Sequence, residues 1–182
     1  AGSPSHYDQF SSPRPLLDFL STRFFDVSSG AGKSGLGRKP CRGFKCRLEL
    51  MRPVCLSIAG SDPSGGAGIQ ADLKTFHRHG VYGAAALTLL TVQNTQGVQD
   101  VRVLEADFVA SQARAVLDDL PVDVVKTGAL GNAAIASAIA AVLRGRALPL
   151  VLDPVMVSKH GAPLLPASEV AGIVECLFPL AT

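Results

Sequence analysis

A glycine-rich segment between two regular patterns most constrains what this chain can fold into. Residues 60–68 read Gly-Ser-Asp-Pro-Ser-Gly-Gly-Ala-Gly and follow the apolar, β-branched run Val54–Ala59. After the segment, Ile69, Leu73 and Phe76 recur at helical spacing, which predicts a strand, a loop and a helix in that order. Glycines let a backbone approach a ligand closely, and the loop delivers its N–H groups to the positive end of the helix. This layout is typical of a ligand-binding loop.

Two common phosphate-binding sequences are excluded for this loop. No Lys-Ser or Lys-Thr pair follows its last glycine, as a Walker A loop requires, and its glycines do not fall as G-x-G-x-x-G. A tight turn rich in Pro and Gly is the alternative interpretation. Asp62 and Asp72 bracket the loop and favour a ligand site, although Asp62 ahead of Pro63 is equally a candidate turn former.

From residue 51 onward, strand patterns alternate with helical patterns. Strands are expected at about 53–59, 83–92, 98–104, 122–126 and 148–152. Helices are expected from the loop to about 79, then at about 109–120, 135–143 and 167–177. Strict alternation with continuously apolar strands predicts an α/β fold with a mostly parallel central sheet and helices on both faces.

Polar residues stand where four of these strands are expected to end. They are Gly60–Asp62, Gln93–Thr95, Lys126–Gly128 and Asp153. In open parallel sheets, ligands bind beyond the carboxyl ends of the strands. The sequence therefore predicts a site at this edge of the sheet.

Three blocks of the sequence resemble one enzyme family. Ala59–Thr75, Leu90–Thr95 and Leu152–Met156 are similar, in this order, to the hydroxymethylpyrimidine and phosphomethylpyrimidine kinases of thiamine biosynthesis, members of the ribokinase-like superfamily. The resemblance implies a three-layer ribokinase-like fold, of which residues 51–182 are the N-terminal part. It also implies ATP-dependent phosphorylation of 4-amino-5-hydroxymethyl-2-methylpyrimidine and of its monophosphate.

The resemblance assigns substrate-binding roles to four residues. Gln93 matches the family's pyrimidine-binding glutamine, and its amide suits the ring nitrogen and exocyclic amine of an aminopyrimidine. Asp72 resembles the residue that closes the pocket near the hydroxymethyl group, Gly60 supplies a backbone contact, and Val155 an apolar wall. Without the resemblance, Gln93 is a strand-end amide that caps loose backbone, and Asp72 is a first-turn acid favoured by the helix dipole.

The nucleotide side of the site is expected to involve two residues. Asp153 is the candidate for organising Mg²⁺ on the phosphates of ATP, directly or through water. Lys126 is a candidate charge partner for Asp153 or for phosphate, and a structural ion pair is the alternative for either residue.

No catalytic base is assigned. The superfamily carries its base, its glycine-rich anion hole and most of its ATP site in the second half of the chain, and no Gly-Thr-Gly element occurs in residues 51–182. The chain is therefore expected to be truncated before that half, to have little or no activity alone, and to leave one side of its sheet unpaired.

One departure and two alternatives bear on the substrate. Ala129 stands where family members commonly have a methionine that packs on the pyrimidine, so a looser pocket is expected. The alternatives are another ribokinase-like enzyme such as a pyridoxal kinase, and a non-catalytic module that binds hydroxymethylpyrimidine.

Charge, cysteines and histidines limit the other classes of partner. Residues 1–50 carry eight Lys or Arg against four acids, and residues 51–182 carry nine against eleven, so the net charge of +2 does not indicate a nucleic-acid binder. No apolar run is long enough to cross a membrane. No C-x-x-C pair occurs, and His77, His79 and His160 lack partners at metal or triad spacing, so they are expected on the surface. A reduced, cytoplasmic protein is expected, and the resemblance implies a homodimeric full-length enzyme.

Residues 1–50 differ from the rest of the chain in composition. They are rich in Ser, Gly, Pro and Arg, and the first methionine is Met51, which predicts a disordered or non-native basic extension. A Ser-rich, basic transit peptide is the alternative, against which the acidic residues of this stretch count. Gly30–Ser34 resembles part of a P-loop, but Val27 stands where the motif needs glycine, which favours a flexible linker.

Overall fold

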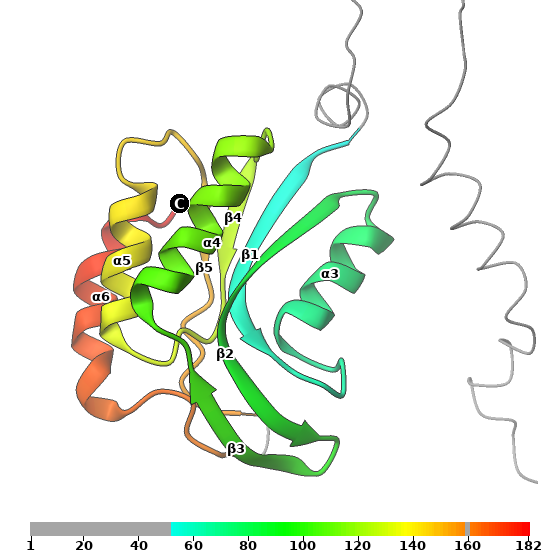
Figure 1. The fold of residues 1–182 in the computed structure, drawn as a ribbon, viewed down its shortest axis with the longest axis vertical. Helices are drawn as coiled ribbons and strands as arrows, with labels where there is room; N and C mark the ends of the chain where they lie inside the picture. The colour runs from blue at the N-terminus through cyan, green and yellow to red at the C-terminus, as the bar shows by residue number, and fades with distance from the viewer. Residues whose placement is uncertain (1–51, 159–160) are drawn as a thin grey trace, which may run out of the picture. The chain divides into compact units, whose positions relative to one another are not determined.

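Five strands form one sheet in the computed structural model, which describes residues 52–158 and 161–182 (Figure 1). The elements that build this part of the chain are, in order, β1 (Val54–Ser61), α3 (Gly68–Arg78), β2 (Tyr82–Asn94), β3 (Gly97–Val103), α4 (Ala106–Asp119), β4 (Val124–Thr127), α5 (Ala133–Leu143), β5 (Leu150–Leu152) and α6 (Val170–Leu177). Short 3₁₀ turns at Ala167–Glu169 and Phe178–Leu180 flank α6. The predictions for residues 1–50 and for His160 lie outside the described residues.

The sheet has the order β3-β2-β1-β4-β5. β1 pairs in parallel with β2 and β4, and β4 pairs in parallel with β5, whereas β3 returns antiparallel to β2 through a tight turn. The predicted mostly parallel α/β sheet is confirmed. Each expected helix and strand is present, with ends that differ by a few residues.

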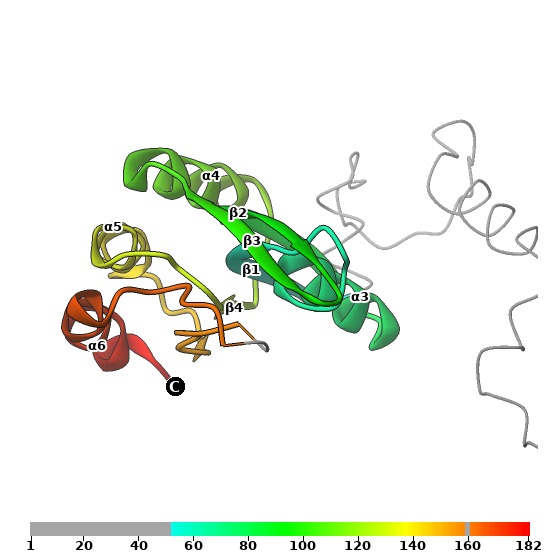
Figure 2. The ribbon, with the colours of Figure 1, turned by 90° about the horizontal axis from the view of Figure 1, so that it is seen from below.

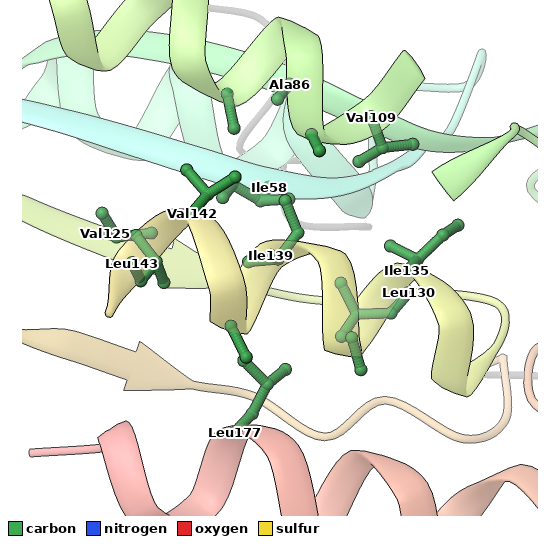
Figure 3. Close-up of a cluster of buried hydrophobic side chains, with 14 of the residues drawn as sticks. Ile58, Ala86, Val109, Val125, Leu130, Ile135, Ile139, Val142, Leu143 and Leu177 are labelled. Carbon is green, nitrogen blue, oxygen red and sulfur yellow. The ribbon is translucent and has the colours of Figure 1, made fainter. Parts of the chain in front are cut away.

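The two faces of the sheet are covered unequally (Figure 2). Helices α4, α5 and α6 lie on one face, and α3 lies on the other face. Ile58 of β1 points towards α5, where Ile139 is fully buried, and Leu177 of α6 is buried on the other side of α5 (Figure 3). The sequence of α5 is apolar nearly all round because it lies between the sheet and α6.

Helix α3 contributes much less burial than the other helices. None of its residues is fully buried. Leu73 and Phe76 pack against β2, where a side chain in place of Gly83 would collide with both. The side chains of β1 that point towards α3 are therefore covered by a thinner layer of protein, and polar side chains such as Ser57 lie there.

The chain changes direction across the sheet between β1 and β4. From β1 it runs through α3 to β2 on one side, and it later returns to β4 on the other side of β1. In open α/β sheets such a switch point opens a crevice beyond the carboxyl ends of the two strands. The fold thus marks the ends of β1 and β4 as the place for a ligand.

Two expected strand ends were placed too early. Gly60 lies inside β1 and Gln93 lies inside β2, because these strands continue to Ser61 and Asn94. β1 keeps its pairing by a register shift between Ala59 and Ser61, an irregularity that apolar spacing does not show.

One side of the sheet was expected to be unpaired, and the outer edge of β5 is partly occupied. The Thr182 N–H donates to the Leu150 carbonyl at 3.0 Å, and the Leu150 N–H donates to Thr182 Oγ1 at 3.2 Å. Val151 is more than half exposed. None of the helices in the described part of the chain has the length and apolarity needed to span a bilayer.

Candidate functional site

A cluster of charged and polar side chains joins α3 to the central strands. Lys126 Nζ of β4 donates to both carboxylate oxygens of Asp72 on α3, at 2.9 and 3.1 Å. Ser57 of β1 donates its hydroxyl to Asp72 Oδ2 at 2.6 Å. Asp153, directly after β5, places Oδ2 at 3.8 Å from the same ammonium. Lys126 therefore connects a carboxylate predicted to contact substrate with one predicted to organise Mg²⁺.

Burial differs sharply within this charged cluster. Ser57 is fully buried, and less than a fifth of the side chains of Asp72 and Lys126 is exposed, whereas half of the Asp153 side chain is open to solvent. Interior charges at this depth require partners, and Asp72 has a cation and a hydroxyl. Among the described residues, the Asp153 carboxylate has the longer contact to Lys126 as its one ion pair, so it is the carboxylate most available to a ligand.

The buried thiol of Cys55 lies near the charged cluster. Burial raises the pKa of Cys55 to about 11, the Asp72 carboxylate adds to this rise, and Lys126 opposes it. The thiol is therefore protonated and unreactive at neutral pH. Cys55 and Cys176 are both free, which agrees with the reduced state expected for them, while Cys41 and Cys46 lie outside the described residues.

The glycine-rich loop does not present its backbone N–H groups to a ligand as its sequence suggested. Asp62 takes them instead: Oδ1 accepts the N–H and the hydroxyl of Ser64, and Oδ2 accepts the N–H groups of Gly66 and Ala67, all at 2.7–3.0 Å. Burial pushes the pKa of Asp62 upward, but these hydrogen bonds outweigh it and hold the pKa below its usual value. Asp62 is therefore the residue that shapes the loop.

The loop is also tied to both elements beside it. Gln70 of α3 accepts the Asp62 N–H at 2.9 Å and donates to Ser61 Oγ at 2.6 Å. Gly68 opens α3 at a φ of +58°, and a Cβ atom there would lie 2.3 Å from the Gly60 carbonyl oxygen. Only glycine allows the start of α3 to lie against the end of β1 in this way.

Gln93 lies near the other end of the site, on β2. Its Oε1 is 3.2 Å from Thr91 Oγ1, and Thr91 Oγ1 is 2.9 Å from the Ser61 carbonyl oxygen. Gln93 is thereby linked to the residue that follows Gly60. Among the described residues, no hydrogen bond or ion pair connects Gln93 to the charged cluster.

Val155 follows Asp153 by two residues, and its N–H donates to the Asp153 carbonyl at 2.9 Å. It lines a shallow apolar cavity between the ends of β4 and β5 and helix α6, together with Gly128, Leu130, Met156, Ile173 and Phe178. Ala129 is buried, and its carbonyl accepts the Thr88 hydroxyl at 2.6 Å. The cavity carries no charged lining residue, so chemistry is better served by the cluster around Lys126.

The structure thus brings together Asp72, Lys126 and Asp153, and connects Gly60 with Gln93 through Ser61 and Thr91. Sequence reasoning missed Ser57 and Thr91. The signal for each was a hydroxyl within a mostly apolar strand, a pattern that also occurs in ordinary cores, as Thr88 of β2 shows. His77 and His79 are exposed as expected.

A protein-held metal was not expected, and the described part of the chain contains no group of three or more His, Cys, Asp or Glu side chains placed to hold one. Asp153, with its exposed carboxylate beside one cation, fits a Mg²⁺ ion that is carried mainly by phosphate oxygens.

Comparisons with known proteins show which protein family this chain is similar to. The family model for phosphomethylpyrimidine kinase matches residues 62–182. A hydroxymethylpyrimidine/phosphomethylpyrimidine kinase from Synechococcus elongatus is 48% identical over 130 residues, covering 71% of this chain and 49% of the relative. The chain spans about half the length of the curated relatives it matches.

Solved structures agree with the sequence matches. The phosphomethylpyrimidine kinase of Clostridium difficile 630 superposes with a TM-score of 0.66 at 44% identity, covering 71% of this chain and 57% of that one. The pyridoxal kinase of Bacillus subtilis, solved as an ADP complex, gives 0.60 at 38% identity, covering 72% and 48%. The ribokinase-like fold is confirmed, and the chain belongs to the phosphomethylpyrimidine kinase family.

Proposed function

We propose that this chain carries the pyrimidine-binding side of a kinase that phosphorylates 4-amino-5-hydroxymethyl-2-methylpyrimidine, or its monophosphate, with ATP. The observation that carries the proposal is the charged cluster at the switch point of the sheet. Asp72, Lys126 and Asp153 come from three separate elements and converge where α/β folds bind ligands. Membership in the phosphomethylpyrimidine kinase family supplies the class of substrate.

The roles follow from the chemistry of each group. Gln93 pairs with the amine and ring nitrogen of the pyrimidine, and the backbone of Gly60 supports the ring. Asp72 accepts a hydrogen bond from the hydroxymethyl group while Lys126 and Ser57 hold its carboxylate in place. Val155 does not share a hydrogen-bonded cluster with these groups, and its role as an apolar wall depends on the cavity that it lines.

Asp153 and Lys126 fit the phosphate side of the reaction. Phosphoryl transfer depends on positioning and on neutralising phosphate charge, which a bound Mg²⁺ ion supplies together with cationic side chains. Lys126 places a positive charge near the exposed carboxylate of Asp153. We propose that Asp153 orients Mg²⁺-bound phosphate, directly or through water, and that Lys126 limits the repulsion between carboxylate and phosphate.

A pyridoxal kinase is the second candidate, because a solved pyridoxal kinase shares 38% identity with this chain. Both ligands carry a hydroxymethyl group on an aromatic nitrogen heterocycle, but only the pyrimidine offers an amine beside a ring nitrogen to Gln93. The distinction therefore depends on this residue.

Binding tests the proposal more directly than turnover, because the chain spans about half the length of its relatives. Thermal unfolding of the chain is measured with the aminopyrimidine, with pyridoxal and with ATP·Mg²⁺ separately. A stabilisation by the aminopyrimidine that Gln93→Ala removes and that Gln99→Ala keeps is expected. Stabilisation by pyridoxal alone would favour the second candidate, and no shift with either heterocycle would contradict both.

A further inference from the structure

The hydrogen-bond arrangement around Thr91 determines which end of the Gln93 amide faces outward. Thr91 Oγ1 lies 2.9 Å from the Ser61 carbonyl oxygen and 3.2 Å from the Gln93 amide atom that is assigned as Oε1. A threonine hydroxyl carries a single hydrogen, and a carbonyl oxygen can only accept. The hydroxyl therefore gives its hydrogen to Ser61, which is the nearer acceptor.

The remaining contact constrains Gln93. With its hydrogen given to Ser61, Thr91 Oγ1 can only accept from the amide, so the group that faces it must be the Nε2 amine. The two ends of a glutamine amide have nearly the same shape, and their assignment follows from the hydrogen-bond network. A half-turn of the amide satisfies both contacts, whereas the opposite orientation leaves two acceptors facing one hydrogen.

We infer that Thr91 is a specificity-determining positioning residue, which holds the Gln93 amide with Oε1 outward. This inference rests on the proposed function of Gln93 as the pyrimidine-binding residue. One Nε2 hydrogen is used on Thr91, and the second remains beside Oε1. Gln93 then presents an acceptor next to a donor, which pairs with an amine next to an unprotonated ring nitrogen. A 4-oxo pyrimidine presents the reverse order, a carbonyl next to a ring N–H. Its carbonyl would then face Oε1 and its ring N–H would face the Nε2 hydrogen, and neither pair can form a hydrogen bond.

The position of Thr91 suits this role. Thr91 and Gln93 lie at the end of β2, with a register shift between Val92 and Gln93, and both side chains are half-buried. The hydroxyl of Thr91 also connects β2 to Ser61, next to Gly60. The orientation of the amide is thereby linked to the backbone expected to support the pyrimidine ring.

The test compares two ligands on the 182-residue chain by calorimetry: 4-amino-5-hydroxymethyl-2-methylpyrimidine and its 4-oxo analogue. Thr91→Val keeps the shape of the side chain and removes the hydroxyl. It is expected to reduce the preference for the amine about three- to tenfold, the effect of about one hydrogen bond. Thr91→Ser restores the hydroxyl and should keep the preference within about twofold. Thr75→Val, the same exchange at an exposed hydroxyl of α3, is the matched control.

A second measurement needs no ligand. In NMR spectra of the unmodified chain, the Nε2 protons of Gln93, identified by their loss in Gln93→Ala, should show a nuclear Overhauser contact to the γ-methyl group of Thr91. A Thr91→Val variant that binds with unchanged preference, or the absence of that contact, would overturn the role of Thr91 alone. Failure of the unmodified chain to bind either pyrimidine would overturn the proposed function and this selectivity together.

Discussion

Lys126 and Asp72, 54 residues apart in the chain, form a two-pronged ion pair in which one ammonium lies within 3.1 Å of both carboxylate oxygens. The pair fastens α3, the only helix on its face within the described residues, to strand β4, which lies beside the central strand β1. It also fixes the orientation of a carboxylate that the proposed function assigns to substrate. One contact thus serves both the fold and the site.

Removal of the ammonium should destabilise the fold. Lys126→Met leaves Asp72 mostly buried with only the Ser57 hydroxyl as partner, so we expect the free energy of unfolding to fall by about 1–3 kcal/mol. Urea denaturation measures the change. Arg102→Gln, which removes the exposed ion pair to Asp100 on β3, is the matched control and should cost at most about 0.5 kcal/mol. Equal losses in the two variants would show that the Lys126 pair is not structurally important.

The start of α3 provides a second prediction. Gly68→Ala places a Cβ atom against the backbone of Gly60 at a positive φ, so we expect a loss of more than about 2 kcal/mol, or failure to fold. Gly80→Ala, also at a positive φ but with no atom within 4 Å of the new Cβ, should cost about 1 kcal/mol. If chemical denaturation shows the two variants to be equally stable, close approach of α3 to β1 is not the reason for glycine at position 68.

A third prediction concerns the first part of β2, with which β3 does not pair. β3 pairs with β2 only from Leu89 onward, and the side chain of Gln112 on α4 takes both backbone groups of Leu87, at 3.0 Å each. Gln112→Ala should therefore cost about 1–3 kcal/mol of unfolding free energy, since two partly buried backbone groups lose their partner. Gln99→Ala on the exposed strand β3 should change stability by less than about 0.5 kcal/mol. A neutral Gln112→Ala would show that water replaces the amide at this edge.

The Asp62 carboxylate should make the free energy of unfolding depend on pH. Because the folded pKa of Asp62 lies below its usual value of about 3.9, the ionised carboxylate stabilises the fold above that pH. That contribution is lost as the pH falls through the lower folded pKa. The difference in unfolding free energy between the unmodified chain and Asp62→Asn should be constant above about pH 5 and shrink below about pH 4. A difference that stays constant down to pH 2 would contradict this role of Asp62.

Much of the fold was predictable from the sequence because most strands are apolar runs and the apolar residues of each helix recur at helical spacing. Four of the six predicted site residues, Gly60, Gln93, Lys126 and Asp153, lie at or near strand ends, which a parallel sheet brings to one edge. The presence of α3 was predictable from Leu73 and Phe76. The direction of Asp72 was not: it lies four residues before Phe76, and its side chain faces the sheet, where Ser57 and Lys126 hold it.

Other features depend on three-dimensional detail. Asp62 captures the loop N–H groups because the backbone turns back on its own carboxylate, and residue spacing does not show this. Ser57 and Thr91 are hydroxyl residues within mostly apolar strands, and their partners, Asp72 and the Ser61 carbonyl, come from other elements. Val155 was grouped with the pyrimidine site, and the structure places it at an apolar cavity that Gly128, two residues after Lys126, also lines.

Mapping of the ligand on the chain tests most directly whether the pyrimidine binds at the ends of β1, β2 and β4. Backbone amide NMR shifts are recorded while 4-amino-5-hydroxymethyl-2-methylpyrimidine is added. The largest changes are expected at Gly60, Asp72, Gln93 and Lys126, and Gln93→Ala is expected to abolish them. Changes confined to the apolar cavity around Leu130 and Phe178, or no saturable change at any residue, would contradict a pyrimidine site at the ends of β1, β2 and β4.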